Sequence, residues 1–334
     1  QQISHLPVGK LIMSGTPMPN TAFDLISQYK FLFPEQNSID ENTVVQRIQD
    51  IYVRTTKTEL GLDIPKIIHT PIPFTEPQKI LYDLSRSEEL RHASGLNKQD
   101  KNYYRSLQRS YMRLLQIVSN PALLMKNTFN YPDALREAVE YGDSGKISYA
   151  IHRTRHLVSE GKKVLIWSGF VENVELISRK LIDLGANYIH GGVESGSEDE
   201  DNKREGIIKN FHENPNSNVL VANPAACSEG ISLHKVCHHA IYIDRNYNAA
   251  QYLQSMDRIH RLGLPKGVDT TIEILITNDS IDERIEGRLR QKINHMAEVL
   301  NDHSLRTEPE EIDLDQTGFS SMDAEDLINH LKEE

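Results

Sequence analysis

Short apolar runs alternate with stretches of helical periodicity between residues 143 and 300, and this alternation constrains the fold more than any other feature. Strands that are buried on both faces read as short continuous apolar segments. Strands that alternate with helices form parallel sheets with helices on both faces. The sequence therefore predicts an α/β fold. We expect strands at 164–167, 188–190, 219–222, 240–243 and 272–276, and helices at 146–160, 171–184, 202–212, 249–260 and 280–300.

The chain before this region follows a different pattern. Residues 10–14 predict a short strand that ends in the turn of residues 14–17, because the turn combines glycine and proline. The helix expected after it carries Phe23, Leu25 and Ile26 on one side. Residues 1–30 therefore predict a strand followed by a helix.

We divide the chain into four parts. Residues 1–34 are the end of a first unit, and residues 35–142 are a mainly helical insert. Prolines interrupt this insert with extended chain, because proline lacks the backbone donor and restricts its predecessor. Residues 143–300 hold the sheet, and residues 301–334 form an acidic tail with one short amphipathic helix at 324–331.

The composition is that of a globular protein with a polar surface. The 334 residues suffice for about two domains, and 38% of them are hydrophobic. No apolar run approaches the ~18–20 residues that span a bilayer. The two cysteines cannot form a disulfide framework and indicate a reducing compartment. Neither a signal peptide nor an initiator methionine opens the sequence. We therefore expect an intracellular fragment, cytoplasmic or nucleoid-associated.

The negative charge is concentrated in two segments. Residues 308–334 contain ten acids and one base, and residues 194–201 contain five acids and no base. These segments account for more than the whole net charge of −11, so the rest of the chain is mildly basic. An acidic total therefore does not exclude nucleic acid, since local patches decide phosphate contacts.

Residues 254–263 form the most specific constellation of polar side chains. Gln254, Arg258 and Arg261 have the spacing i, i+4 and i+7, which predicts that a helix places them on one face. Arginine offers a fixed charge and forked donors, and phosphoryl transfer needs positive charge over the phosphate oxygens. The motif indicates phosphate binding, with a solvated helix as the alternative. We interpret His260 as a polar neighbour, with a general base as the alternative.

Three turns at expected strand ends are further candidate sites, because ligands of open α/β sheets bind beyond the carboxyl ends of strands. The turn after residues 219–222 is rich in small residues and includes Gly230, which lets backbone approach a ligand closely. The turn of residues 168–170 would present backbone N–H groups to a phosphate. The turn of residues 14–17 is the third candidate. An ordinary connection remains the alternative for each of them.

Metal-binding patterns are absent from the sequence. There is no G-x-x-x-x-G-K-[ST] loop and no Asp-Glu-x-His box, so this chain alone predicts no magnesium site. Cys237 lies near three histidines, but the sequence has no C-x-x-C pair, which disfavours zinc. We interpret the acidic run of residues 194–201 as a solvated loop.

The order of these motifs resembles that of Swi/Snf-type DNA translocases of helicase superfamily two, over roughly residues 8–300. The resemblance is carried by segments similar to motifs III, IV, V and VI of that family, which are residues 14–20, 164–170, 225–233 and 254–263. Additional segments resemble its basic-threonine, Leu-Pro-Pro-Lys, Cys-Asn-His-Pro and Asp-x-x-Trp-Asn-Pro elements, and these are residues 54–57, 64–66, 116–124 and 244–248.

This resemblance implies two RecA-like lobes with ATP between them and Mg²⁺ held by residues outside this chain. Arg258 and Arg261 would contact the γ-phosphate, with Arg261 as the arginine finger. The remaining residues implied for ATP are Gln254, Asp257, Glu229 and Gly230. Those implied for the DNA backbone are Asn223, Ser168, Gly169 and Gly192, and those implied for coupling nucleotide state to lobe closure are Ser14, Gly15 and Thr16.

Several positions depart from the family pattern. Leu264 stands in place of Gln, Tyr247 in place of Trp and Ala249 in place of Pro, and residues 228–230 are an atypical motif V. These departures favour bacterial or viral members over eukaryotic nucleosome remodellers. Motifs I, Ia and II are missing, so we expect this chain alone to be inactive and to function with an upstream part of the same polypeptide.

The sequence therefore predicts a DNA-stimulated ATPase that moves along double-stranded DNA through phosphate contacts, without sequence specificity. One alternative is a helicase that separates DNA or RNA strands, and another is a non-catalytic lobe that binds nucleic acid or a partner. For the acidic tail we favour plain disorder, with autoinhibitory DNA mimicry and partner binding as alternatives. Genome defence, repair and transcription all use such motors, and the sequence does not choose among them.

Overall fold

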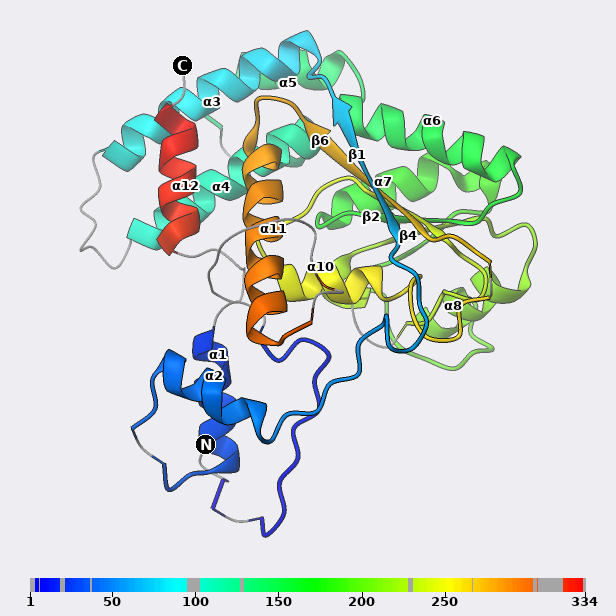
Figure 1. Ribbon diagram of the computed structural model, residues 1–334. Coiled ribbons are helices and arrows are strands. Elements are labelled where there is room, and N and C mark those ends of the chain that lie inside the picture. The colour runs from blue at the N-terminus through cyan, green and yellow to red at the C-terminus, as the bar shows by residue number, and fades with distance from the viewer. Residues whose placement is uncertain are drawn as a thin grey trace.

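The computed structural model describes residues 4–5, 7–18, 22–36, 38–94, 103–126, 129–227, 231–265, 267–302, 305 and 321–332. Figure 1 shows a parallel sheet with helices around it and a smaller N-terminal part that lies away from the sheet. Within these ranges no helix combines the length and the apolar character that a membrane crossing requires.

The sheet has six parallel strands in the order β1-β6-β5-β2-β4-β3. It confirms the predicted α/β class, and the five predicted strands are each found within one residue or so of the expected bounds. The strands are β1 Lys66–Ile72, β2 Val164–Trp167, β3 Asn187–Ile189, β4 Val219–Ala222, β5 His239–Tyr242 and β6 Thr271–Thr277.

Strand β1 comes from the segment that the sequence assigned to the helical insert. It pairs with β6 over its whole length, from Lys66 beside Thr271 to Ile72 beside Thr277. Pro71 is compatible with this place because proline is tolerated in edge strands, where one row of backbone groups needs no partner. The division of the chain at residue 142 stays a prediction, but one strand from before it completes the sheet.

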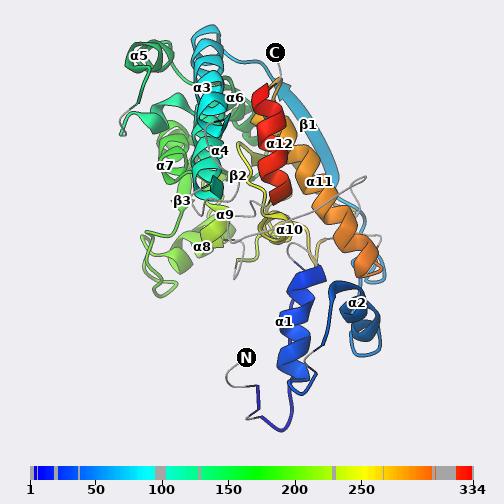
Figure 2. The ribbon, with the colours of Figure 1, turned by 90° about the vertical axis from the view of Figure 1, so that its left-hand side faces the viewer.

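The side chains of each central strand alternate between two apolar layers. In β2, Val164 and Ile166 pack in the layer formed with helices α6 (Gly145–Ser159) and α7 (Val171–Lys180). Leu165 and Trp167 pack in the layer that includes α8 (Arg204–Glu213), α10 (Ala249–Met256) and α11 (Ile281–Val299). Such alternation follows from the period of two in a strand. Helices therefore cover both faces of the sheet, as predicted (Figures 1 and 2).

The helices begin where capping residues and proline punctuation place their ends. Asn248 and Ser280, for example, accept backbone N–H groups at the starts of α10 and α11. The helices are α1 Ala22–Leu32, α2 Glu41–Gln49, α3 Glu76–Ser94, α4 Tyr103–Ser119, α5 Pro132–Glu140, α6 Gly145–Ser159, α7 Val171–Lys180, α8 Arg204–Glu213, α9 Pro224–Cys227, α10 Ala249–Met256, α11 Ile281–Val299 and α12 Ser321–Lys332, with 3-10 turns η1 Pro121–Leu124 and η2 Ile182–Leu184.

The N-terminal part corrects two expectations. Residues 10–14 form no strand, because no other strand in the described part of the chain lies beside them, and Leu11 and Met13 are 79% and 86% exposed. Helix α1 forms as predicted, but Phe23 is exposed. Tyr29 instead joins Leu25 and Ile26 on the buried side.

The last part of the acidic tail forms a helix, α12, although plain disorder was the favoured expectation. Helix α12 includes the predicted helix of residues 324–331 and packs against α3, α4 and α11 (Figures 1 and 2). Ala324, Leu327 and Leu331 are buried in the contact. The correction has an electrostatic reason as well. Asp323 is fully buried and forms ion pairs with Arg288 and Lys292 of α11, so this acid is neutralised within the fold.

Candidate functional site

The predicted helix that carries Gln254 ends earlier than expected. Helix α10 ends at Met256, and residues 257–260 form a turn. Two long-range hydrogen bonds explain the early end. The carbonyl of Arg258 accepts from the backbone N–H of Leu233 at 2.8 Å, and the ring of His260 bonds to the carbonyl of Asp63 at 2.7 Å. The expectation that one helix places Gln254, Arg258 and Arg261 on a single face is therefore wrong.

The two arginines have different surroundings. Arg258 is half-buried, and it donates from Nε to the carbonyl of Gln254 at 2.9 Å and from Nη1 to the carbonyl of Ile231 at 2.8 Å. Arg261 is exposed. Burial, and then the nearby charge of Arg261, lower the pKa of His234. Arg258 is thus bonded to the residues after β4, while the guanidinium of Arg261 is open to solvent.

The structure brings Gln254 to the turn of residues 14–17. Its side-chain amide donates from Nε2 to Thr16 Oγ1 at 3.0 Å, across 238 residues of sequence. Ser14 Oγ accepts from the backbone N–H of Thr16 at 3.2 Å, and Arg54 donates to the carbonyl of Gly15 at 3.0 Å. The residues expected to couple nucleotide state to lobe closure therefore lie directly against the residue expected to bind ATP.

Charged groups surround a cavity of about 330 Å³ between the N-terminal part and α10. Arg54 pairs with the buried Asp302 at 2.5 Å, and Lys57 pairs with Asp257. Burial, and then the charge of Lys57, lower the pKa of His260. A neutral His260 donates from Nε2 to the carbonyl of Asp63, so its Nδ1 accepts and faces Lys57 Nζ at 3.5 Å. His260 therefore joins the turn after α10 to the segment of residues 57–63.

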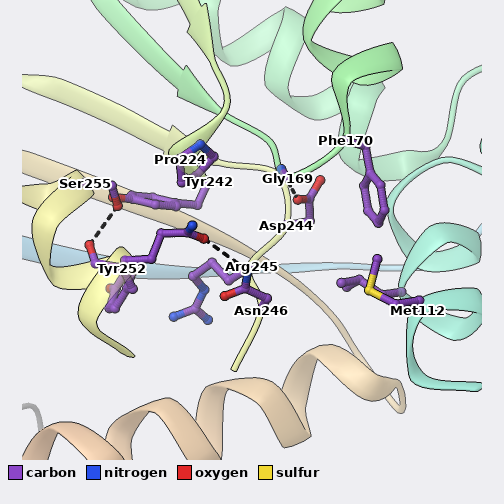
Figure 3. Close-up of a pocket in the computed structure, with 12 residues that line it drawn as sticks. Met112, Gly169, Phe170, Pro224, Tyr242, Asp244, Arg245, Asn246, Tyr252 and Ser255 are labelled. Carbon is purple, nitrogen blue, oxygen red and sulfur yellow. Dashed lines mark hydrogen bonds between the residues drawn. The ribbon is translucent and has the colours of Figure 1, made fainter. Parts of the chain in front are cut away.

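A second group of predicted residues lies at the carboxyl ends of β2 and β4, next to Asp244, which follows β5. Of these, Gly169 lines a cavity of about 80 Å³ together with Asp244 (Figure 3). Ser168 is buried and donates from Oγ to Asp244 Oδ2 at 2.7 Å, and the backbone N–H of Gly169 donates to Asp244 Oδ1 at 2.5 Å. Asn223 donates from Nδ2 to the carbonyl of Gly169 at 2.8 Å. Gly169 itself is exposed.

These contacts change the expected chemistry of this turn. The N–H of Gly169 and the hydroxyl of Ser168 donate to a carboxylate of the same chain, so they are not presented to a phosphate in this arrangement. Burial raises the pKa of Asp244, against the opposing effect of these hydrogen bonds. The turn offers an ordered, exposed backbone segment at the sheet edge instead.

The remaining predicted residues lie elsewhere or outside the described ranges. Gly192 is exposed after β3 and donates its N–H to His190 Nδ1 at 3.0 Å. In the acidic run that follows, Glu194 pairs with Lys203. Glu229 and Gly230 fall outside the described residues, so their places cannot be compared with the prediction. Among the described residues, no three His, Cys, Asp or Glu side chains are grouped so that they could hold a metal ion.

Asp244 is not among the residues that the sequence predicts for the site, although it lies in one of the segments that resemble the family. Ser119, which donates to Asp244, and Asn173, which donates to Ser119, are not among them either. A usable signal exists for Asp244, since a carboxylate directly after a buried apolar strand lies at the carboxyl edge of the sheet. Ser119 and Asn173 carry no comparable signal, because their partners are distant in sequence.

Comparisons with known proteins agree with this fold and its motifs. The model of the helicase conserved C-terminal domain matches residues 146–263. An uncharacterized ATP-dependent helicase of Mycoplasma pneumoniae is 24% identical over 293 residues, which cover 82% of this chain and 26% of that protein. Comparable identities of 22 to 25% occur in bacteria and in eukaryotes, so the expected closeness to bacterial or viral members stays a prediction.

Two solved structures share the fold. The C-terminal part of the Fun30 ATPase domain has a TM-score of 0.53 and 19% identity, and the alignment covers 81% of this chain and 97% of that one. The SWI2/SNF2 ATPase core of Sulfolobus solfataricus in complex with dsDNA has a TM-score of 0.52 and 21% identity, covering 87% of this chain and 62% of that one. This chain spans about a quarter of the length of the first curated relatives that it matches.

Proposed function

We propose that this chain, which corresponds to the C-terminal half of a Swi/Snf-type ATPase core of helicase superfamily two, supplies the arginine side of the ATP site in a double-stranded DNA translocase. The observation that carries this proposal is the hydrogen bond between Gln254 and Thr16. It joins the two motifs that the family places on opposite sides of its nucleotide, and the exposed Arg261 follows in the same segment.

The arginines fit the work of charge stabilisation. A transferring phosphoryl group carries negative charge on its outer oxygens, and an arginine placed over them accelerates hydrolysis by about 10³–10⁵. Arg261 is exposed, so its side chain is accessible to a nucleotide, whereas Arg258 is bonded to the carbonyls of Gln254 and Ile231. We assign the finger role to Arg261 and the role of positioning the motif, with γ-phosphate contact on closure, to Arg258.

The residues present fit only part of a nucleotide. Two guanidiniums and an amide are suitable donors for phosphate oxygens. Among the described residues, no three His, Cys, Asp or Glu side chains are grouped so that they could hold a metal ion. We therefore propose that residues outside this chain complete the ATP-binding site and hold its Mg²⁺. We also propose that this chain alone does not hydrolyse ATP. When bound, Mg²⁺ would neutralise phosphate charge.

The proposed track for DNA is the carboxyl edge of the sheet. The archaeal SWI2/SNF2 core that shares this fold was solved in complex with dsDNA. In this chain the same edge carries the exposed Gly169 and Gly192, with Asn223 bonded behind Gly169. The N–H groups of Gly169 and Gly192 are bonded within the chain, so we propose that other groups along this edge contact the phosphates. Phosphate contacts do not read bases, and we therefore propose binding without sequence preference. This activity would place the protein with intracellular DNA.

An exposed apolar groove favours the proposal that an upstream part of the same polypeptide packs against this chain. Residues from 7 to 53 line a cavity of about 720 Å³. Several of its apolar side chains are strongly exposed, including Leu11, Met13 and Val53. Large exposed apolar patches mark interaction sites. The groove therefore fits the remainder of a first RecA-like lobe, which would also supply the phosphate-binding loop.

The test is ATP hydrolysis by the complete polypeptide, with and without duplex DNA of increasing length. A translocase gives stimulation that grows with duplex length. Arg261→Ala should lower turnover by about 10³-fold or more, whereas Arg136→Ala, at an exposed surface pair on α5, should leave it unchanged. Wild-type turnover in Arg261→Ala would contradict the finger role. Strand displacement from a forked duplex would favour the helicase alternative, and DNA binding without hydrolysis would favour the non-catalytic lobe.

A further inference from the structure

Helix α4 has an excess of positive charge on the side that faces solvent. Its 17 residues include three arginines, at positions 105, 109 and 113, and neither aspartate nor glutamate. Arg105 and Arg109 are exposed, whereas Leu107 and Leu114 are buried on the other side of the helix. A helix with one apolar and one polar side packs by the first and presents the second to water. We call the exposed side with Arg105 and Arg109 the basic face of α4.

The fold neutralises one of the three arginines and leaves the other two available. Arg113 donates from Nη1 to the buried carboxylate of Glu89 on α3 at 2.6 Å. Within the ranges that the structure describes, neither Arg105 nor Arg109 has a hydrogen-bond or ion-pair partner. These two residues are four positions apart, which is about 6 Å along the helix axis. Two guanidiniums with fixed charge and forked donors therefore face solvent side by side.

The backbone of α4 is fixed to the sheet and to α3. Ser119, its last residue, donates from Oγ to Asp244 Oδ2 at 2.7 Å. The buried Gln78 of α3 donates from Nε2 to the carbonyls of Ile117 at 2.8 Å and Val118 at 3.1 Å. Because these contacts set the position of the helix, a ligand of the basic face has to order only the arginine side chains, which lowers the entropy cost of binding.

The basic face borders the carboxyl edge of the sheet. Met112 follows Arg109 by three residues on the same side of α4, and it is 40% exposed. It lines the cavity of about 80 Å³ together with Gly169 and Asn246, which follow β2 and β5 (Figure 3). A ligand that lies along the carboxyl edge can therefore continue over Met112 onto the two arginines.

We propose that the basic face of α4 binds phosphates of the DNA duplex, through Arg105 and Arg109, beside the carboxyl edge of the sheet. This inference rests on the proposed function and deepens it, because it names side chains that contact the duplex. A duplex carries one phosphate per ~3.4 Å of axis on each strand, so two arginines about 6 Å apart meet phosphates at every position along it. An acidic protein segment would match them in one position only, and a motor that moves along its ligand needs the repeating charge.

The test compares two pairs of substitutions that remove the same charge from the complete polypeptide. The first pair is Arg105→Ala with Arg109→Ala. The matched control pair is Arg136→Ala with Arg179→Ala, because these arginines are also exposed and lie on α5 and α7. Arg179 is in the last turn of α7, at the end away from Gly169, which precedes the first. A third protein carries Arg105→Lys with Arg109→Lys, which keeps the charge.

The measurement is the affinity for duplex DNA of two unrelated sequences, by fluorescence anisotropy, at salt concentrations from about 50 to 200 mM. Each phosphate contact contributes about 0.9 to the slope of log affinity against log salt, so the alanine pair should lower that slope by about 2. An exposed ionic contact is worth up to about fivefold, so affinity should fall by about tenfold for both sequences. The control pair should keep the wild-type affinity and slope, and the lysine pair should keep most of both.

The outcomes separate this inference from the proposed function. Wild-type affinity and slope in the alanine pair overturn the inference alone, and so does an equal loss in the control pair or in the lysine pair. If the thermal midpoint shows that the alanine pair does not fold, Arg105→Ala and Arg109→Ala are measured singly, and each should lower the slope by about 1. A wild type that binds duplex without duplex-stimulated ATP hydrolysis overturns the proposed function, while the slopes still decide the role of α4. A wild type that binds no duplex overturns both.

Discussion

Replacing Asp323 with alanine tests whether the acidic tail is docked by its buried charge. The carboxylate is fully buried and lies 2.7 Å from Arg288 Nε and 3.2 Å from Lys292 Nζ. Removing one partner of a buried ion pair costs about 3–5 kcal/mol, because the other charge is left behind. Lys292 keeps a hydrogen bond to the carbonyl of Tyr247 at 2.9 Å, and Arg288 keeps one to Gln291 at 2.6 Å. We therefore expect the lower end, about 3 kcal/mol.

The cost should appear as undocking of α12 before it appears as global unfolding. Undocking lets water reach Arg288 and Lys292, and α12 is a single terminal helix that packs on three others. Because about 1.4 kcal/mol corresponds to a factor of ten, 3 kcal/mol corresponds to roughly a hundredfold loss of protection. Native-state hydrogen exchange of the amides of residues 324–331, read by mass spectrometry, measures this quantity directly.

A neighbouring acid provides the control. Glu325 is exposed on the same helix, so Glu325→Ala should change protection by less than about 0.5 kcal/mol, or roughly twofold. Protection of α12 in Asp323→Ala within threefold of the wild type would refute the reasoning, since the buried pairs would then contribute nothing to docking. Only a lack of protection of α12 in the wild type would restore the expectation that this segment is a plain tail.

Two further predictions concern stability. His330 is buried against the hydroxyl of Tyr82, and burial, followed by nearby positive charges, lowers its pKa to about 4. Because the folded pKa lies below the ordinary value, the stabilisation from His330 is complete above about pH 6.5 and is lost as pH falls toward 4, by about 2 kcal/mol at pH 5. Hydrogen exchange of α12 measured from pH 7 to 5 should show this loss of stability, and His330→Gln should remove the pH dependence. A flat wild-type profile would contradict the prediction. Asp326 has a raised pKa and affects stability in the opposite direction, mainly at lower pH. Gly185 has φ of 69°, and a Cβ there would lie 2.0 Å from the carbonyl oxygen of Asn216, so Gly185→Ala should lower stability by more than about 2 kcal/mol in urea unfolding, and a wild-type midpoint would show that the loop yields freely.

The central sheet could be predicted because its signal is local. Strands β2 and β4 read as uninterrupted apolar runs, and the structure buries each of their residues. Strand β1 gave no such signal. It lies at the edge, its burial is mixed, and Pro71 stands within it. Its pairing with β6 depends on a partner about 200 residues away, which no local pattern records.

The site residues show the same limit. The spacing of Gln254, Arg258 and Arg261 is that of a helix, yet the helix ends at Met256 because distant backbone groups at Leu233 and Asp63 bond to the turn. The spacing rule was sound, but tertiary hydrogen bonds decided the conformation. The tail differs from its expectation for a similar reason. Its composition indicates a solvated segment, and only the two cations of α11 explain why one of its acids is buried.

One short segment connects the two halves of the proposed site. Asp244 and Gln254 are separated by the turn before α10 and by part of α10, so the carboxylate and the amide move together unless the helix is deformed. The Asp244 end is held by three hydrogen bonds in the interior, whereas the described contact from the Gln254 side chain to Thr16 is one hydrogen bond between half-buried residues. When the N-terminal part and the sheet move relative to each other, the bond to Thr16 should therefore break first, while the Gly169 turn stays fixed to α10. On this reasoning the Gly169 turn and the helix that carries Gln254 form one rigid unit, and opening takes place at Thr16.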